Sequence, residues 1–417
     1  MTRATIGAVE SAAAEQPVPV GRFLGLCLVD FTARISYNIA RTPVLPLFAA
    51  ALGANEALIG LIVAISTVTG IFVKAPAGAF SDHFGRGRTL LIGAAVFALT
   101  PFFYIFVAYA AMLVAIRLFH GLATAIYGPV ANATAAELAG RRRGEFLAWF
   151  SLIKIATNAI GGVIGAAILF WLGGDQPTIG DFHKAYGICG LFGLVGLVAA
   201  LMLLPRIDRP RPEQKRSARQ ALAKLWSGLA ETITNLRVLI TSGCESVQNM
   251  TMGILQAFLP IYVVYQAKLS IMDAGLLWGI ITGTSVVAKP LMGRLSDRYG
   301  RRWVIAAGMI LCALPFAAMP LFRSFGILSM LGVVFGLGEA FVTSSTTALV
   351  SELCQQRSLG AALGVFGTLA DTGQAIGPIV AGLLLASIGY VTAFAAVSVL
   401  LVLWTVLFVL LVRPAAD

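Results

Sequence analysis

Charged side chains stand inside long apolar runs of this chain, and their types indicate two kinds of chemistry. A carboxyl group in apolar surroundings can bind and release a proton, because desolvation favours its neutral form. A guanidinium group can hold an anion through paired hydrogen bonds. A charge at the centre of a membrane helix costs about 2.5–3.5 kcal/mol, so each is a candidate functional residue. They are Asp30, Arg34, Arg41, Lys74, Arg117 and Lys154 in the first half of the chain, and Glu245, Lys289, Glu339 and Asp371 in the second.

The apolar runs around these charges are long enough to cross a membrane. Hydrophobic residues make up 58% of the 417 positions and charged residues only 12%, with a mean hydropathy of +0.88. A spanning helix needs about 20 mostly apolar residues. We therefore predict an all-α membrane protein with twelve transmembrane helices in two six-helix halves. The spans fall roughly at residues 24–47, 57–77, 89–108, 111–136, 146–172, 185–205, 237–264, 274–292, 302–322, 326–350, 359–386 and 389–411.

A polar segment between the second and third spans recurs 215 positions later, in the corresponding gap of the second half. The first copy is Gly78-Ala-Phe-Ser-Asp82-His-Phe-Gly85-Arg86, and the second is Gly293-Arg-Leu-Ser-Asp297-Arg-Tyr-Gly300-Arg301. An internal repeat at a fixed offset indicates two related halves. Related halves built of apolar spans, with a substrate site between them, are typical of secondary transporters.

The spans and the polar gaps also predict the domain organisation. The first residues have no apolar core of a signal peptide, and we interpret them as a disordered tail. The longest polar stretch separates the two halves. The predicted segments are a cytoplasmic N-terminal tail at 1–22, a six-helix half at 23–205, a cytoplasmic linker at 206–235, a six-helix half at 236–412 and a cytoplasmic C-terminal tail at 413–417.

The orientation follows from the basic residues. Arginine and lysine cluster at 141–143 and 206–224, whereas the gaps on the other side contain only Lys184, Lys268 and Arg323. Basic loops stay in the cytoplasm, so both tails are predicted to be cytoplasmic. The net charge of +11 is thereby explained by topology, and nucleic-acid binding is not expected.

Enzymatic, metal and redox chemistry have no support in the sequence. The five cysteines are an odd number without the spacing of a disulfide framework or a metal site. The three histidines are scattered, and no CxxC, HExxH or phosphate-binding glycine loop occurs. We therefore expect no cofactor, no bound metal and no enzymatic activity.

The repeated pattern Gly-x-x-x-Asp-x-x-Gly-Arg resembles the signature loop of the major facilitator superfamily. The resemblance covers the whole chain and implies a latch between the halves on the cytoplasmic side of the outward-facing state. In that family the loop aspartate faces the eleventh helix, and the arginine pairs with an acid at the end of the fourth. Topology-setting charges are the alternative reading. The residues are Gly78, Asp82, Gly85, Arg86 and Glu137, with the mirror set Gly293, Asp297, Gly300, Arg301 and Glu352.

Three further segments indicate which branch of this family the chain resembles. The run around Arg117 in the fourth span resembles a motif whose membrane-embedded arginine supports proton coupling. The eleventh span is similar to a helix-packing motif of twelve-helix drug–proton antiporters, through Gly373, Gly377, Pro378 and Gly382. The fifth span departs from the antiporter pattern, because Gly161 and Gly162 stand where proline is expected. That departure leaves the direction of transport open.

The first span carries a polar stripe. Asp30, Arg34, Asn38 and Arg41 lie on one helical face about 17 Å long, which cannot face lipid. Arg41 and Arg117 are expected at a similar depth, where two guanidinium groups would attract an anion. The alternative is that each arginine neutralises a buried acid. Candidate substrate-cavity residues are Arg34, Tyr37, Asn38, Arg41, Gln248, Asn249 and Gln256.

Buried carboxyl groups are the candidates for moving protons. Glu339 and Asp371 lie near mid-span, and Glu245 aligns with Asp30 by the repeat. Lys74 and Lys289 are expected to reach toward the membrane surface. The candidate proton-coupling residues are Asp30, Arg117, Glu245, Glu339 and Asp371.

The sequence thus predicts a monomeric, proton-coupled secondary transporter in the inner membrane. Its partners would be a small-molecule substrate, protons and the lipid bilayer. Export of a small organic compound is the first hypothesis, from the resemblance to drug–proton antiporters. Uptake of an anionic metabolite or metal chelate is the second, favoured by the arginine set. A transporter-like sensor or scaffold is the third.

Overall fold

The computed structural model describes residues 20–139, 142–207, 234–354 and 359–412, which form helices joined by short turns. In this part of the chain, eleven helical stretches are long and apolar enough to cross a membrane. The last stretch, α14 at Leu359–Leu411, is two helices joined at Gly389, whose φ of 74° and ψ of 175° are not helical. The described chain therefore has twelve spanning segments, which confirms the predicted all-α membrane fold.

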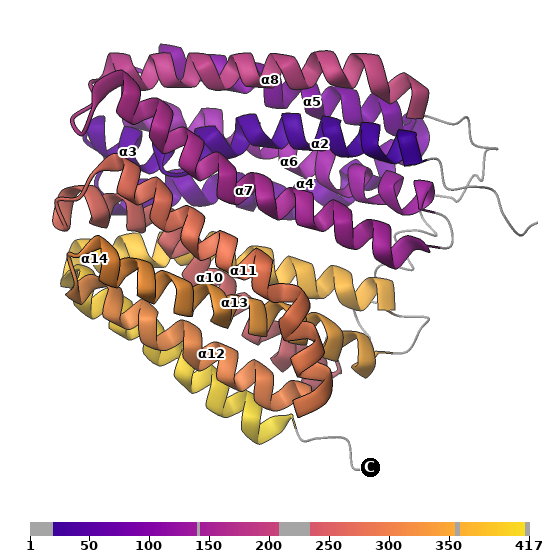
Figure 1. Cartoon of the computed structure of the whole chain (residues 1–417), viewed down its shortest axis with the longest axis vertical. Helices are drawn as coiled ribbons and strands as arrows, with labels where there is room; N and C mark the ends of the chain where they lie inside the picture. The colour runs from indigo at the N-terminus through magenta and orange to yellow at the C-terminus, as the bar shows by residue number, and fades with distance from the viewer. Residues whose placement is uncertain (1–19, 140–141, 208–233, 355–358, 413–417) are drawn as a thin grey trace, which may run out of the picture.

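The two halves lie side by side as separate helical groups (Figure 1). The first contains α2 (Val20–Arg41), α3 (Val44–Ala51), α4 (Glu56–Phe84), α5 (Arg86–Phe103), α6 (Ala110–Leu138), α7 (Arg143–Gly173) and α8 (Ile179–Ile207). The second contains α10 (Leu236–Ile261), α11 (Ile271–Tyr299), α12 (Arg301–Ala318), α13 (Phe325–Leu353) and α14. Short turns extend three of them, η1 (Tyr104–Phe106), η3 (Tyr262–Gln266) and η4 (Met319–Leu321).

Side-chain caps and glycines set several helix boundaries. Asn55 accepts a hydrogen bond from the Leu58 amide at the start of α4, and Ser270 forms a capping box with Asp273 at the start of α11. Each cap satisfies amides that have no partner inside the helix. Gly85 and Gly300 end α4 and α11 with φ of 91° and 86°, a backbone conformation that glycine adopts without strain.

The repeated segment is mostly helix, and the prediction that it forms a polar loop is wrong. α4 continues to Phe84 and α11 to Tyr299, so each copy occupies the last turns of a helix and a single glycine. The predicted apolar spans, which end roughly at residues 77 and 292, stop several residues before these helix ends. Apolar length predicts only the part of a helix that lies in lipid, whereas backbone hydrogen bonds continue into its polar last turns.

The first span is broken near its middle. α2 ends at Arg41 and α3 begins at Val44, with Pro43 between them. Proline has no backbone N–H and cannot continue the hydrogen bonding of the preceding turn. The break places Arg41 in the last turn of α2, where the partial negative charge of a helix C-terminus favours a cation.

Large apolar side chains cover the outside of the helical bundle. Phe72, Trp171, Val287 and Met330 are all exposed and lie on helices from both halves. In water such a surface would be unfavourable, whereas in a bilayer it contacts lipid tails. The buried apolar residues inside each half form its packed core.

The halves are in close contact near one end of the described bundle. We call the end at which α2 begins and α14 ends the terminal face, and the other end the opposite face (Figure 1). Near the opposite face, a Cβ on Gly60 of α4 would lie 2.1 Å from the Pro378 carbonyl oxygen of α14. On the other side of the bundle, a Cβ on Gly275 of α11 would lie 2.2 Å from the Ala166 side chain of α7. At these two places the halves pack too closely to admit even a methyl group.

The proposed domain boundaries remain predictions. Residues 1–19 of the predicted tail, 208–233 of the predicted linker and 413–417 lie outside the described residues. Within the described chain, α8 ends at Ile207 and α10 begins at Leu236, so the two halves adjoin the predicted linker on both sides.

Candidate functional site

A cavity of about 560 Å³ lies between the two halves, from mid-bundle toward the terminal face. Helices α2, α4, α6 and α7 of the first half line it, together with α10, α11, α13 and α14 of the second. Most of its lining residues are polar, and the basic ones outnumber the acidic ones. The charged lining residues are Arg34, Arg41, Lys74, Lys154 and Lys289, against Glu339 and Asp371.

Two arginines flank one tyrosine at the inner end of the cavity. The guanidinium carbons of Arg41 and Arg117 each lie 5.6 Å from the centre of the Tyr37 ring. Arg117 is 1% exposed and donates hydrogen bonds to the Ile62 carbonyl oxygen and the Ser66 hydroxyl. Arg41 lines the cavity, and its Nε is buried without a hydrogen-bond partner. The sequence placed both arginines at one depth and named Tyr37 as a cavity candidate, but it did not predict that the tyrosine ring lies between them.

The residues of the polar stripe on α2 make different contacts. Arg34 donates from its Nε to both carboxylate oxygens of fully buried Asp30, each at 2.9 Å. Asn38 donates to the Thr157 hydroxyl of α7 at 3.2 Å. Arg34 therefore neutralises a buried acid. Arg41 and Arg117 do not, because no described carboxylate lies within ion-pair distance of either.

Lysines pair with two of the three acids inside the spans of the second half. Lys74 of α4 pairs with Asp371 of α14, and this contact joins the two halves inside the cavity. Lys289 of α11 pairs with Glu339 of α13 at 3.5 Å. The lysines point into the cavity, so the expectation that they reach toward the membrane surface is wrong. The two lysines occupy corresponding positions in the repeat, inside their helices, and this pattern could have predicted the role.

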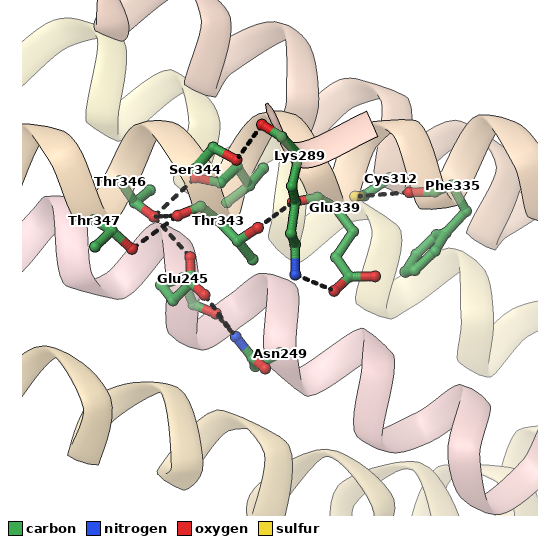
Figure 2. A network of polar contacts seen from close by, with 11 residues as sticks. Glu245, Asn249, Lys289, Cys312, Phe335, Glu339, Thr343, Ser344, Thr346 and Thr347 are labelled. Atoms are coloured by element: carbon green, nitrogen blue, oxygen red, sulfur yellow. Dashed lines mark hydrogen bonds and ion pairs between the residues drawn. The ribbon is translucent and has the colours of Figure 1, made fainter. Parts of the chain in front are cut away.

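A second polar cluster lies in the second half, next to the cavity (Figure 2). Glu245 of α10 is 6% exposed, and its carboxyl lies 2.7 Å from the Thr346 hydroxyl of α13. Asn249 donates to the other carboxyl oxygen at 3.2 Å and also lines the cavity. Gln248 and Gln256 are buried and contribute nothing to the cavity lining, although both have amide nitrogens without a partner.

The latch residues form ion pairs within each half. Arg86 pairs with Glu137 at 2.8 Å, and Arg301 pairs with Glu352 at 2.6 Å and with Asp297 at 2.9 Å. The Asp82 side chain lies outside the described residues. A Cβ on Gly78 or on Gly293 would meet nothing within 4 Å, so neither glycine is at a close helix contact in this conformation.

The helix-packing residues of α14 hold it against α10 and α4. A Cβ on Gly373 would lie 1.9 Å from the Ser246 carbonyl oxygen, and one on Gly377 would lie 2.3 Å from that of Met250. One turn further, Gly382 meets the Glu56 carbonyl oxygen of α4. These glycines let the backbones approach closely, as small residues do in membrane helices. They thereby fix the helix that carries Asp371.

Residues that could hold a metal do not gather anywhere in the described chain. Its His, Cys, Asp and Glu side chains form no group of three or more with a suitable arrangement. The four cysteines at 27, 189, 244 and 312 are buried and unpaired, and Cys354 is partly exposed. The chemistry that the cavity offers is ion pairing, hydrogen bonding and proton binding.

Relatives of this chain are transporters. A probable nitrate/nitrite transporter of Mycobacterium tuberculosis is 26% identical over 347 residues, 80% of this chain and 82% of that protein. An uncharacterised transporter of Methanocaldococcus jannaschii is 23% identical over 361 residues, 86% of this chain and 89% of its own length. A homologue of a multidrug efflux pump in Lactococcus lactis is 27% identical over 175 residues, 41% of this chain and 42% of its own.

A solved structure has the same fold. The nucleoside transporter NupG superposes with a TM-score of 0.76 at 16% identity, and the match covers 93% of this chain and 98% of that one. The family model of the Major Facilitator Superfamily matches residues 26–288 and again 241–417. Its members carry solutes across membranes and are not enzymes. This chain, a multi-pass membrane protein with two six-helix halves, belongs to the Major Facilitator Superfamily.

Proposed function

We propose that this protein is a proton-coupled secondary transporter of a small anion. The observation that carries the proposal is the charge of the cavity between its halves. Five cationic side chains line it against two carboxylates, so that its formal charge is positive. A lipophilic drug would need an apolar and aromatic lining, whereas this lining is dominated by charged and amide side chains.

Arg41 supports an anion-binding site most directly. Its guanidinium is at the cavity wall, has a buried Nε without a partner, and lies beside a second arginine that also has no described carboxylate. A carboxylate, nitrate or phosphate group can accept two parallel hydrogen bonds from a guanidinium. The nitrate/nitrite transporter among the relatives supports the same class of substrate.

Alternating access explains why the halves touch near the opposite face while the cavity extends toward the terminal face. We infer that the terminal face is cytoplasmic, because the basic clusters of the sequence adjoin it. The contacts of Gly60 and Gly275 would then close the external side, and the cavity would open inward. The latch acts in the outward-facing state, in which the terminal ends of the two halves would meet.

Export of an organic compound is the second candidate. The efflux-pump relative and the glycines of α14 favour it. The direction of transport is set by the substrate and proton gradients and by how their movements are coupled. A polar cavity is compatible with export of an anionic compound. Uptake and export of an anion are therefore two versions of one proposal.

A ligand screen on the purified protein tests the substrate class. A ligand at a hundredfold excess over its Kd stabilises the folded state by about 2.7 kcal/mol. We expect nitrate, phosphate, succinate or citrate to raise the thermal unfolding midpoint, and organic cations to leave it unchanged. Stabilisation by lipophilic cations alone would contradict the proposal.

Cysteine labelling tests the orientation. Arg142 precedes α7 on the terminal face, and Asp175 follows α7 on the opposite face; both are exposed. We expect Arg142→Cys to react only with reagent on the cytoplasmic side and Asp175→Cys only from outside. Reaction of Asp175→Cys with a cytoplasmic reagent would contradict the twelve-span topology.

The latch makes a separate prediction about rates. Asp82→Asn and Asp297→Asn are expected to fold normally but to transport slowly, because they shift the balance between inward- and outward-facing states. The substrate affinity measured from one side should change too, since a ligand shifts such a balance through its differential affinity. Initial transport rates in vesicles are the measurement, and wild-type rates in both variants would count against the latch.

A further inference from the structure

The buried carboxyl group of Glu245 makes contacts that require one more hydrogen than its neighbours can supply. The Thr346 hydroxyl oxygen lies 2.8 Å from the Val342 carbonyl oxygen and 2.7 Å from Glu245 Oε2. Both are hydrogen-bond distances between oxygen atoms. A carbonyl oxygen can only accept, and a hydroxyl has one hydrogen to donate.

One hydrogen cannot lie on the line to both acceptors. A neutral Glu245 satisfies both contacts, because the threonine hydroxyl can then donate to the Val342 carbonyl, as helical threonines do toward the preceding turn, and accept from the acid. The short contact with Glu245 then needs a hydrogen from Glu245 itself. Asn249 donates to the other oxygen, Oε1, at 3.2 Å. One donating and one accepting oxygen is the pattern of a neutral carboxylic acid.

The charges around Glu245 lead to the same result. The charged groups that interact with it are Lys289 from α11 and Glu339 from α13. These two pair with each other at 3.5 Å, so the lysine charge is already matched (Figure 2). Cys312 of α12 and Cys244 of α10 are the neighbouring thiols, while Asp371 of α14 pairs with Lys74. An ionised Glu245 would be a buried and unmatched negative charge.

The other three mid-span acids differ from Glu245 in this respect. Asp30 pairs with Arg34, Glu339 with Lys289 and Asp371 with Lys74. Within the described residues, Glu245 alone of the four has no basic side chain within ion-pair distance. Asn249 connects it to the cavity, because its amide contacts Glu245 and its side chain also lines the cavity wall.

We propose that Glu245 is the residue that carries the coupling proton, with Thr346 and Asn249 as its positioning residues. It holds the proton on Oε2 in the conformation described here, and it releases that proton to water when a change of state separates it from Thr346 or hydrates it through the cavity. The coupling role rests on the proposed function, whereas the protonation does not.

Infrared difference spectroscopy of the purified full-length protein tests the protonation. Glu245→Gln preserves both contacts, because an amide can donate to Thr346 and accept from Asn249. We expect the difference spectrum, wild type minus Glu245→Gln, to contain the carbonyl band of a protonated carboxylic acid at neutral pH. The matched control, Glu339→Gln, should remove carboxylate bands instead. Thr346→Val should shift the acid band, and Thr346→Ser should restore it. Carboxylate bands alone in the Glu245→Gln difference would overturn the proposal.

Proton movement tests the coupling role. Proteoliposomes with an internal pH dye are given a gradient of nitrate, phosphate or succinate. Wild-type protein should move protons with at least one of these anions, and Glu245→Gln should fall to the rate of protein-free liposomes while keeping its thermal unfolding midpoint. Equal rates in variant and wild type would overturn the coupling role. An acid band without proton movement in wild type would contradict the proposed function and leave the protonation standing.

Discussion

Arg41→Gln is expected to weaken binding of the transported anion by about 10- to 100-fold, because a hydrogen bond to a charged group contributes about 1.5–3 kcal/mol and each 1.4 kcal/mol is tenfold in affinity. The side chain lies at the cavity wall and neutralises no described acid. Its loss should therefore remove ligand contacts without exposing an unmatched charge. The dissociation constant, measured by thermal shift or calorimetry, is the quantity to compare.

A basic residue outside the cavity provides the control for Arg41. Lys184 is 65% exposed near the opposite face and pairs only with Asp181, at 2.9 Å. Lys184→Gln removes the same formal charge from the chain and should leave the affinity unchanged. Equal weakening by both variants would mean that the net charge of the protein, rather than the site at Arg41, sets the affinity.

Charge reversal at the ion pair between the halves is expected to have the second large effect. Lys74→Asp places two carboxylates together where α4 meets α14, and Asp371→Lys places two ammonium groups there. Either variant should lose most of its transport, because like charges oppose the conformation described here. The double variant Lys74→Asp with Asp371→Lys restores opposite charges and should regain much of the rate.

A double-mutant cycle measures the strength of this pair. The side chains are 40% and 25% exposed, so solvent screening reduces their attraction. We expect a coupling free energy of about 0.5–3 kcal/mol from thermal unfolding, within the range for residues in contact. The exposed pair Arg142 and Glu145 on the terminal face is the control, and its reversal should leave transport intact. A double variant as inactive as the single ones would contradict a role for the pair itself.

The repeat and the apolar lengths predicted the architecture because both are local properties of the sequence. Gly85 and Gly300 stand where the chain must turn within one residue, and only a positive φ allows it. The acids at the ends of α6 and α13, Glu137 and Glu352, followed from the resemblance. The helix ends were predicted less well, since polar last turns carry no apolar signal.

The contacts of the cavity depend on helix packing and could not be predicted in the same way. Lys74 and Asp371 are 297 positions apart, and Glu245 and Thr346 are 101 apart. Which residues meet depends on the rotation of each helix about its axis. Glycines such as Gly373 and Gly60 permit that rotation, because a Cβ there would lie only 1.9 and 2.1 Å from a carbonyl oxygen of the neighbouring helix. The sequence identified the charged residues of the spans, and the structure determined their partners.

Transport into inside-out vesicles under an imposed pH gradient shows whether proton movement drives anion transport. Nitrate, phosphate, succinate, a citrate–metal chelate and a set of organic cations are offered separately, with vesicles lacking the protein as the reference. We expect the pH gradient to drive net movement of at least one anion, and a protonophore to abolish that movement. Gradient-driven movement of organic cations alone, or anion movement that ignores the pH gradient, would contradict the proposed function.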